Sequence, residues 1–345
     1  LWFDEMGTLT GAGWGGRWLD AIRKPLTIPT TPKPPLSFLV TRMFLALGDR
    51  VFLLRLPAVF FATLSIPLSL SLGRAMFGAR VGLVGALLLA VAPLFIRYAQ
   101  EARMYAMLTF LLTLSLYLFW QAIHSRRATW WVAFAAAAIL ALYTHLFALL
   151  GLAALFLFAL WHTAASQSKA GFASQWRRFG LAMLAIAIAY APMIPFVFRG
   201  IASGEGLGGE PARGWDLAAM LSAIRLFSTG SQAGMILYLG LALLALVALA
   251  RKGRQVWVLA ALWLFLPPAL VLLLPFGHLV LVRYFLFGLP LYLLLVAYGL
   301  LRVLGWPSRQ FARLKDSRTT SLPAMWLTTT LSLVILATLS LPSLS

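Results

Sequence analysis

The chain has 345 residues, of which 62% are hydrophobic and only 11% are charged, with a mean hydropathy of +0.91. A soluble domain is about half apolar and about a quarter charged, so this composition excludes a soluble globular protein and indicates the bilayer as its solvent. In a soluble protein the net charge of +19 would suggest binding to nucleic acid. Here most basic residues fall in loops between apolar segments, which indicates that they set the membrane topology and contact anionic lipid.

The first predicted element is an extracytoplasmic loop over residues 1–51, which opens with Asp4 and Glu5 rather than with a basic signal segment. Its apolar part, Pro35–Leu47, follows another proline and is too short to span a bilayer. An interfacial or re-entrant helix is therefore predicted there. We also expect that a transmembrane helix precedes the Asp4-Glu5 pair in the full protein and is missing from this sequence.

Apolar segments that approach the roughly 20 residues needed to cross a bilayer follow this loop. Ten spans are predicted, at 52–72, 81–97, 104–122, 130–144, 146–162, 179–198, 233–250, 256–276, 284–301 and 324–342. A second long loop is expected at 199–232. The sequence thus predicts an all-α fold, a polytopic transmembrane helical bundle that forms one domain over residues 1–345.

The charges of the loops predict the orientation of this bundle. With Asp4 and Glu5 outside, the inside loops contain 15 of the 28 basic residues and one acid, Asp316, while the other eight acids lie outside. Basic residues in short loops favour the cytoplasmic side. We therefore expect a multi-pass protein of the plasma (inner) membrane, with the lipid bilayer as a partner and no nucleic acid.

The sequence offers few of the common catalytic signatures. It contains no cysteine, which excludes disulfides, thiolate catalysis and cysteine-based metal sites. It also contains no P-loop, no Rossmann fingerprint and no His spacing typical of a metal site. Any chemistry must come from carboxylates, arginines, tyrosines and isolated histidines.

Asp4 and Glu5 are the first such group, at the predicted outer boundary of the membrane. Adjacent carboxylates there are costly unless they are solvated, paired or bound to metal. One of them could act as a general base toward an acceptor hydroxyl or amine, or hold a divalent cation such as Mg²⁺ or Mn²⁺. The alternative is an ordinary solvated pair in a loop.

The second group lies between two predicted spans and contains Arg97, Tyr98, Glu101, Arg103 and Tyr105. Arginine suits phosphate because its planar fork can donate two hydrogen bonds. In a helix, residues 97, 101 and 105 would share one face. The alternative is interfacial anchoring by the tyrosines and arginines, with a local Glu–Arg pair.

Four further polar residues lie near predicted span ends. Arg283 and Tyr284 begin an apolar segment at the outer face, where the cation could bind a lipid phosphate or simply anchor the helix at the interface. His145 lies between two spans and could contact substrate, or be a hydrogen-bonded histidine at a helix junction. Lys33 precedes two prolines and could contact phosphate or belong to an ordinary surface loop.

Several short motifs occur in a fixed order: Leu1-Trp2-Phe3-Asp4-Glu5, Lys33-Pro34-Pro35-Leu36, Leu54-Arg55-Leu56-Pro57-Ala58, Tyr98-Ala99-Gln100-Glu101-Ala102-Arg103-Met104-Tyr105 and Arg283-Tyr284. This ordered set resembles the bacterial dolichyl-phosphate-mannose–protein mannosyltransferase-like proteins. These are relatives of protein O-mannosyltransferase and of the lipid A aminoarabinose transferase, with the C-type glycosyltransferase fold. The resemblance covers nearly the whole chain and departs at Lys33, where these proteins often carry His.

The resemblance implies a polyprenyl-phosphate-sugar donor and transfer, with inversion at the sugar carbon, to a protein, lipid or glycan acceptor on the extracytoplasmic face. It implies catalytic roles for Asp4, Glu5 and Glu101, with Asp4 also a candidate metal ligand. It further implies that Arg103 and Arg283 contact the donor phosphate. With the residue chemistry above, the predicted phosphate-binding residues are Lys33, Arg97, Arg103 and Arg283, and the predicted substrate contacts are Tyr98, Tyr105, His145 and Tyr284.

Two other functions compete with the glycosyltransferase. A transporter or flippase of lipid-linked sugars would need ionisable groups near span centres or paired interrupted helices. The spans hold few charges, and their main interruptions are Pro192, Pro195, Pro267 and Pro268. A non-catalytic scaffold would leave the cluster at 97–105 unexplained. Convergence of Asp4, Glu101, Arg103 and Arg283 on one cavity would favour the enzyme.

Overall fold

The computed structural model describes residues 3–13, 16–27, 33–48, 51–125, 127–165, 169–202, 217–273 and 282–314. Within these ranges the secondary structure is helical and includes no strand. In chain order the helices are α1 (Phe3–Gly11), α2 (Asp20–Thr27), α3 (Leu36–Leu45), α4 (Val51–Phe77), α5 (Ala79–Ala90), α6 (Pro93–Ala99), α7 (Tyr105–His124), α8 (Ala128–Thr144), α9 (Ala148–Ala165), α10 (Lys169–Tyr190), η1 (Ala191–Met193), α11 (Ile194–Ala202), α12 (Leu217–Ser228), α13 (Gln232–Lys252), α14 (Arg254–Leu273), η2 (Val282–Gly288) and α15 (Leu289–Leu314).

Seven helical segments of the described residues are long and apolar enough to cross a membrane. They comprise α4, α7, α9, α13, α14 and the compound segments Gln175–Arg199 and Val282–Gly305. The bent pair α5–α6 is a candidate for an eighth span, and α8 has only 17 residues. The predicted polytopic helical fold is confirmed, while the predicted span at 324–342 lies outside the described residues.

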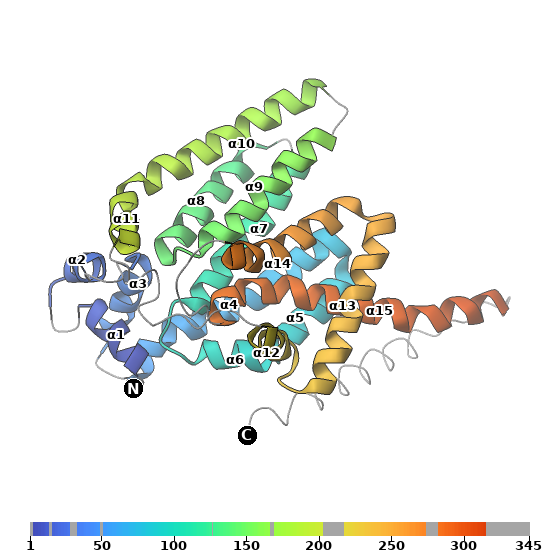
Figure 1. Cartoon of the computed structure of the whole chain (residues 1–345), viewed down its shortest axis with the longest axis horizontal. Helices are drawn as coiled ribbons and strands as arrows, with labels where there is room; N and C mark the ends of the chain where they lie inside the picture. Colours follow the sequence, from blue (N-terminus) through green and yellow to red (C-terminus); the bar gives the residue numbers. More distant parts are fainter. Residues whose placement is uncertain are drawn as a thin grey trace.

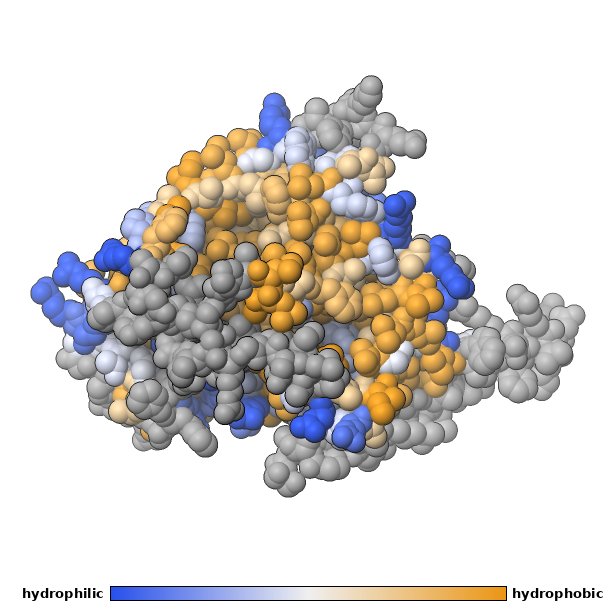
Figure 2. Space-filling model, in the orientation of Figure 1, coloured by the Kyte–Doolittle hydropathy of each residue, from blue (hydrophilic) through white to orange (hydrophobic). Residues whose placement is uncertain are grey.

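The spanning helices form one packed bundle (Figure 1), in which α4 packs along α5 and α7, and α5 packs along α15. Small residues permit the closest approach: a Cβ atom added at Gly73 of α4 would collide with Gly82 of α5 and Leu294 of α15. Apolar side chains also cover much of the outer surface, which Figure 2 shows as a broad orange area with hydrophilic residues near its margins. Such a surface suits contact with lipid tails.

Prolines decide where the predicted straight spans break. The predicted span 81–97 is divided into α5 and α6, which meet at 60°. Pro93 begins α6 and Ala92 before it is extended, because proline disfavours the helical conformation of the preceding residue. The predicted span 284–301 also departs from a straight α-helix, because it starts as the 3-10 helix η2. By contrast, α4 continues through Pro57 and Pro67, as transmembrane helices often do.

The predicted loop 1–51 contains three helices. The interfacial helix expected at Pro35–Leu47 is α3, and the Phe44 ring lies 6.3 Å from that of Phe60 on α4. Figure 1 shows α1, α2 and α3 grouped at one edge of the bundle. The exposed side chains of Met43 and Leu47 continue the apolar surface of α4 onto α3. The placement of α3 at the membrane interface stays a prediction.

The second predicted loop, 199–232, is described only in part. It includes the end of α11 and the whole of α12, so this segment is more helical than its glycine content predicts. Residues 203–216 lie outside the described part of the chain. The division of the chain into one domain with two long outer loops stays a prediction.

Candidate functional site

Tyr105, at the start of α7, is the centre of a cluster built from distant parts of the sequence. Its side chain is buried, and its ring centroid lies 5.8 Å from Tyr98 of α6, 5.8 Å from Tyr284 of η2 and 6.0 Å from His145 at the α8–α9 junction. The bend between α5 and α6 places Tyr98 beside the start of α7. All four predicted substrate contacts therefore come together.

Two arginines flank the same ring. The guanidinium carbon of Arg103 lies 5.6 Å from the centroid of Tyr105, and that of Arg283 lies 5.4 Å from it. Arg103 also donates a hydrogen bond of 3.3 Å to the Tyr105 hydroxyl. Two cations held on one aromatic ring create a strongly positive place at which an anionic group such as phosphate is favoured.

A cavity lies beside Arg103, between α1, α3, α4 and the start of α7. Its polar lining includes Thr8, Lys33, Ser37, Thr41 and Arg103, and apolar residues of α4 and α7 complete it. The backbone of Lys33 is fixed by a hydrogen bond of 2.9 Å from its N–H to the carbonyl of Pro25. Lys33 therefore joins Arg103 in one hollow, where the two cations could bind the same anion.

His145 is neutral in this surrounding. Burial lowers its pKa to about 3, and the nearby charges of Arg103, Lys33 and Arg283 act in the same direction. Its Nδ1 accepts a hydrogen bond of 3.1 Å from the backbone N–H of Phe147. A neutral imidazole that accepts at Nδ1 carries its proton on Nε2. His145 is thus a hydrogen-bonded histidine at a helix junction, and its contact with substrate stays a prediction.

Glu101 is the partly buried carboxylate of the cluster. Its Oε1 lies 3.6 Å from Nε of Arg97, whose side chain is 71% exposed. Burial raises the pKa of Glu101, and the positive charges of Arg97, Arg283 and Arg103 oppose that rise. Glu101 therefore lies within the electrostatic reach of the two cluster arginines. Arg97 lies at the outer margin, and its predicted contact to phosphate stays a prediction.

Glu5 has a different surrounding. Its side chain is 2% exposed and accepts two hydrogen bonds of 2.9 Å from Arg55, one to each carboxylate oxygen. It accepts a third, of 3.1 Å, from the backbone N–H of Ala102. Glu5 thus ties α1 to α4 and to the segment before Tyr105. This arrangement favours a positioning role for Glu5, and its predicted catalytic role stays untested.

Arg55 is the residue that sequence reasoning missed. The motif Leu54-Arg55-Leu56-Pro57-Ala58 was part of the ordered set, but it suggested no role for its arginine. Arg55 and Ala102, which both donate to Glu5, lie 50 and 97 residues from it in sequence. Only the motif's place in the ordered set pointed toward it.

Asp4 belongs to α1, directly before Glu5, but its side chain lies outside the described residues. Of the four residues whose convergence on one cavity would favour the enzyme, Glu101, Arg103 and Arg283 lie near one another around Tyr105, and Arg103 is the one that lines the cavity described above. Within the described part of the chain, no three His, Asp or Glu residues gather as metal ligands do. Glu5 is bound to Arg55 and Glu101 is faced by arginines, so these two carboxylates do not fit a divalent cation. A metal at Asp4 stays a prediction.

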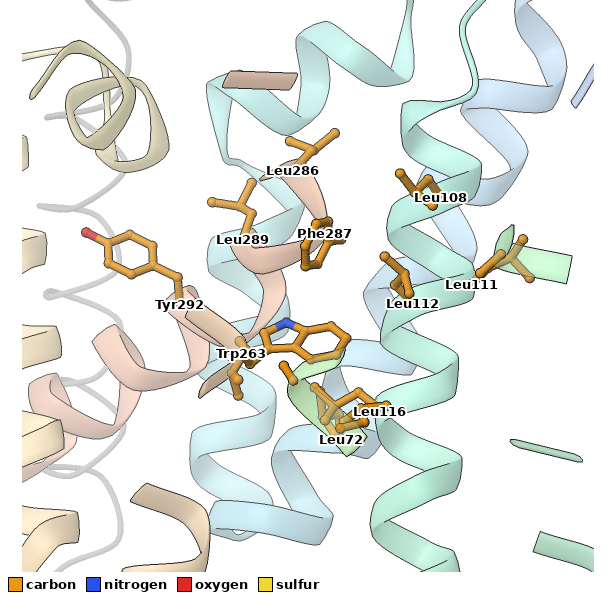
Figure 3. Packing of buried hydrophobic residues seen from close by; sticks show 14 of the residues in the cluster. Leu72, Leu108, Leu111, Leu112, Leu116, Trp263, Leu286, Phe287, Leu289 and Tyr292 are labelled. Atoms are coloured by element: carbon orange, nitrogen blue, oxygen red, sulfur yellow. The ribbon is translucent and has the colours of Figure 1, made fainter. Parts of the chain in front are cut away.

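A second cavity, of about 240 Å³, lies between α12, α13, α14, η2 and α15. Its lining is almost entirely apolar and includes Trp263, Phe285, Phe287 and Tyr292. Figure 3 shows the indole of Trp263 beside Phe287, at 5.5 Å between ring centroids. The segment η2 thus contributes Arg283 and Tyr284 to the cationic cluster and its later residues to this cavity.

Comparisons with known proteins agree with this geometry. Residues 32–196 match the model of the dolichyl-phosphate-mannose-protein mannosyltransferase family. The chain is similar to the crystal structure of ArnT from Cupriavidus metallidurans in the apo state, with a TM-score of 0.62 and 19% identity over 88% of this chain and 56% of that chain. For ArnT bound to undecaprenyl phosphate, the TM-score is 0.58 with 20% identity over 81% and 52% of the two chains. No curated protein sequence matches significantly.

The chain therefore spans about half the length of these solved structures and shares their fold. The family match includes Lys33, Arg55, the segment 97–105 and His145, whereas Glu5 and Arg283 lie outside it. Together the two findings confirm the resemblance predicted from the ordered motifs.

Proposed function

We propose that this chain, which is like the mannosyltransferase family in sequence and like ArnT in fold, is a membrane glycosyltransferase that moves a sugar from a polyprenyl-phosphate donor to an acceptor. The observation that carries the proposal is the convergence of Arg103, Arg283 and Glu101 around Tyr105. A similar structure that contains undecaprenyl phosphate supports the donor class.

The cations suit the leaving group of such a reaction. When the bond between the sugar carbon and the phosphate oxygen breaks, that oxygen gains negative charge. Arg103, Arg283 and Lys33 would stabilise this charge from positions that are already fixed. Because the leaving group is already a phosphate, no nucleotide-binding element is needed.

The carboxylate of Glu101 suits activation of the acceptor. Glu101 would accept the proton of the acceptor hydroxyl or amine as that group attacks the sugar carbon. A single attack on the face opposite the phosphate forms the new glycosidic bond, inverts the sugar carbon and releases polyprenyl phosphate. Asp4, directly before the buried Glu5 on α1, is the second candidate for this base.

The apolar cavity suits the lipid part of the donor. Along a 3-10 helix the rise is about 2 Å per residue, so Arg283 and Phe287 are separated by only about 8 Å along η2. An anionic head held by Arg283 would therefore leave its first isoprene units within reach of Phe285 and Phe287. We infer that this cavity receives the start of the polyprenyl chain.

The test of the function is a transfer assay with the full chain in proteoliposomes that contain a polyprenyl-phosphate sugar labelled in the sugar. We expect the label to become covalently attached to an acceptor from cell-envelope fractions, with release of polyprenyl phosphate. Movement of intact labelled lipid across the bilayer without cleavage would instead favour a flippase and contradict the proposal.

The pH dependence of transfer tests the role of Glu101. A base must be ionised, and burial raises the pKa of Glu101, so transfer should fall as the pH drops through a value above the ordinary range of glutamate. Arg97 is the largest of the influences that lower this pKa, so Arg97→Gln should shift the acidic limb of kcat/KM to higher pH. An unchanged or downward-shifted limb would contradict this role.

We further propose that the site faces the extracytoplasmic side. Successive helices would cross in alternate directions, so the site segments lie at one end, and Arg74, Arg80, Arg127, Arg251 and Arg254 lie at the other. Because the chain has no cysteine, single cysteines report cleanly on topology. An impermeant maleimide added outside intact cells should label Gln100→Cys, and should label Thr129→Cys only after permeabilisation. Both positions are exposed, and the reverse pattern would overturn the orientation.

A further inference from the structure

The aromatic part of the cluster has a buried layer and an accessible layer. Tyr105 and Phe147 are buried, whereas Tyr98, His145 and Tyr284 remain partly exposed. Tyr284 stacks on Phe147 at 4.7 Å between ring centroids with an interplanar angle of 25°. His145 lies 5.5 Å from Tyr284 and 5.4 Å from Phe147. The rings thus support one another and leave an accessible aromatic surface next to the arginines.

This surface contains one neutral hydrogen-bond donor of defined position. Because Phe147 N–H occupies Nδ1 of His145, only Nε2–H can serve a ligand. The groups that face the imidazole are the cations Arg103, Lys33 and Arg283, from three different segments, and the phenols Tyr105 and Tyr284. Burial and these cations disfavour a second proton on the ring.

We propose that Tyr98, His145 and Tyr284 form the subsite for the sugar ring of the donor, in which His145 donates a hydrogen bond from Nε2 to a sugar oxygen. This inference rests on the proposed function. A sugar ring presents an apolar C–H face, which suits an aromatic surface, and hydroxyl or ring oxygens, which suit a neutral donor. The arginines beside this surface would hold the phosphate to which the same sugar is attached.

The fixed tautomer also limits which group of the sugar His145 can contact. Nε2–H can bond only to an acceptor, and a protonated amine has no acceptor lone pair. An ammonium group at this position would also lie near the positive charges of Arg103, Lys33 and Arg283. The group that His145 contacts is therefore a hydroxyl or ring oxygen and not a protonated amine.

A matched pair of variants tests the donor. In His145→Asn the side-chain oxygen lies near the position of Nδ1 and can still accept from Phe147 N–H, but nothing replaces Nε2–H. In His145→Gln the side-chain amide nitrogen lies near the position of Nε2 and restores a donor. Binding to the full chain in nanodiscs should be measured with polyprenyl-phosphate sugar and with the same polyprenyl phosphate without sugar.

We expect His145→Asn to weaken binding of the sugar-bearing lipid about tenfold, the size of one hydrogen bond, and to change binding of the sugar-free lipid by less than about twofold. His145→Gln should lie within about threefold of the unsubstituted protein for both lipids. Equal losses for both lipids, or an unaffected Asn variant, would each overturn the subsite.

The pH dependence of the effect of His145→Asn tests the neutral state. The sugar-bearing lipid is a phosphodiester whose charge is constant between pH 5 and pH 8, whereas the sugar-free phosphate monoester has a second pKa of about 6. The loss of affinity for the sugar-bearing lipid caused by His145→Asn should therefore stay constant over this range, because the folded-state pKa of His145 is about 3. A loss that fades as the pH falls through about 6.5, the ordinary value for histidine, would contradict an imidazole that stays neutral over this range. These measurements need no turnover, so a chain that prefers the sugar-bearing lipid through His145 but transfers no sugar would refute the proposed function alone.

Discussion

Replacing Glu101 by glutamine is expected to lower kcat for sugar transfer by about 10²–10⁴-fold, the usual contribution of a general base. The substitution keeps the shape of the side chain but removes its ability to take a proton from the acceptor. Because Arg103 and Arg283 are retained, binding of the donor lipid should change much less than kcat. The measurement is steady-state transfer at saturating donor, together with donor affinity.

Two comparison variants sharpen this result. Gln100→Ala alters the exposed neighbour of Glu101, and it should transfer normally. Asp4→Asn tests the other candidate carboxylate. If Asp4→Asn abolishes transfer while Glu101→Gln retains normal turnover, the base is Asp4 and the role assigned to Glu101 is wrong. Normal turnover in Asp4→Asn would remove Asp4 from the mechanism.

The features that the sequence predicted well are those that depend on composition and local order. Apolar segments of membrane length identify the bundle, because lipid selects for them irrespective of their packing partners. The segment 97–105 was recognisable because Arg97, Glu101 and Tyr105 lie close together in sequence and are more polar than a connection between two spans requires. These local patterns located the site.

The features that were missed depend on which distant residues meet. Nothing near Arg55 in sequence indicates that its partner is Glu5, or that the same carboxylate also accepts from the backbone N–H of Ala102. Proline content alone does not distinguish Pro93, where α5 and α6 are separated, from Pro57, through which α4 continues. The tautomer of His145 depends on one backbone N–H two residues later, which requires the geometry of the α8–α9 junction.

Replacing Arg55 by alanine is expected to lower the stability of the fold by about 2–4 kcal/mol. Removing one partner of a fully buried pair costs roughly 3–5 kcal/mol, because the other charge is left unpaired, and the partial exposure of Arg55 reduces this cost. Glu5 is 2% exposed, so water cannot readily replace the lost hydrogen bonds. The measurement is the free energy of unfolding in mixed micelles as the fraction of denaturing detergent increases.

A double-mutant comparison separates the ion pair from general damage to α4. In the double variant Glu5→Gln, Arg55→Met the buried carboxylate is neutral, so the double variant should be more stable than Arg55→Ala. Equal losses in the two proteins would show that Arg55 contributes through packing and not through Glu5.

The hydrogen bonds that join Glu5 to Arg55 and Ala102 should also affect catalysis, because they position the carboxylates of the site. Glu5 connects α1, which carries Asp4, to Ala102, which lies between Glu101 and Arg103. Arg55→Lys keeps the positive charge but cannot form the two parallel hydrogen bonds of the guanidinium. We therefore expect Arg55→Lys to lower kcat more than it weakens donor binding, because Arg283, which also holds the phosphate, belongs to η2 and not to the segments that the tie joins. A parallel loss of both quantities would mean that the tie supports the whole site and not the relative placement of its carboxylates.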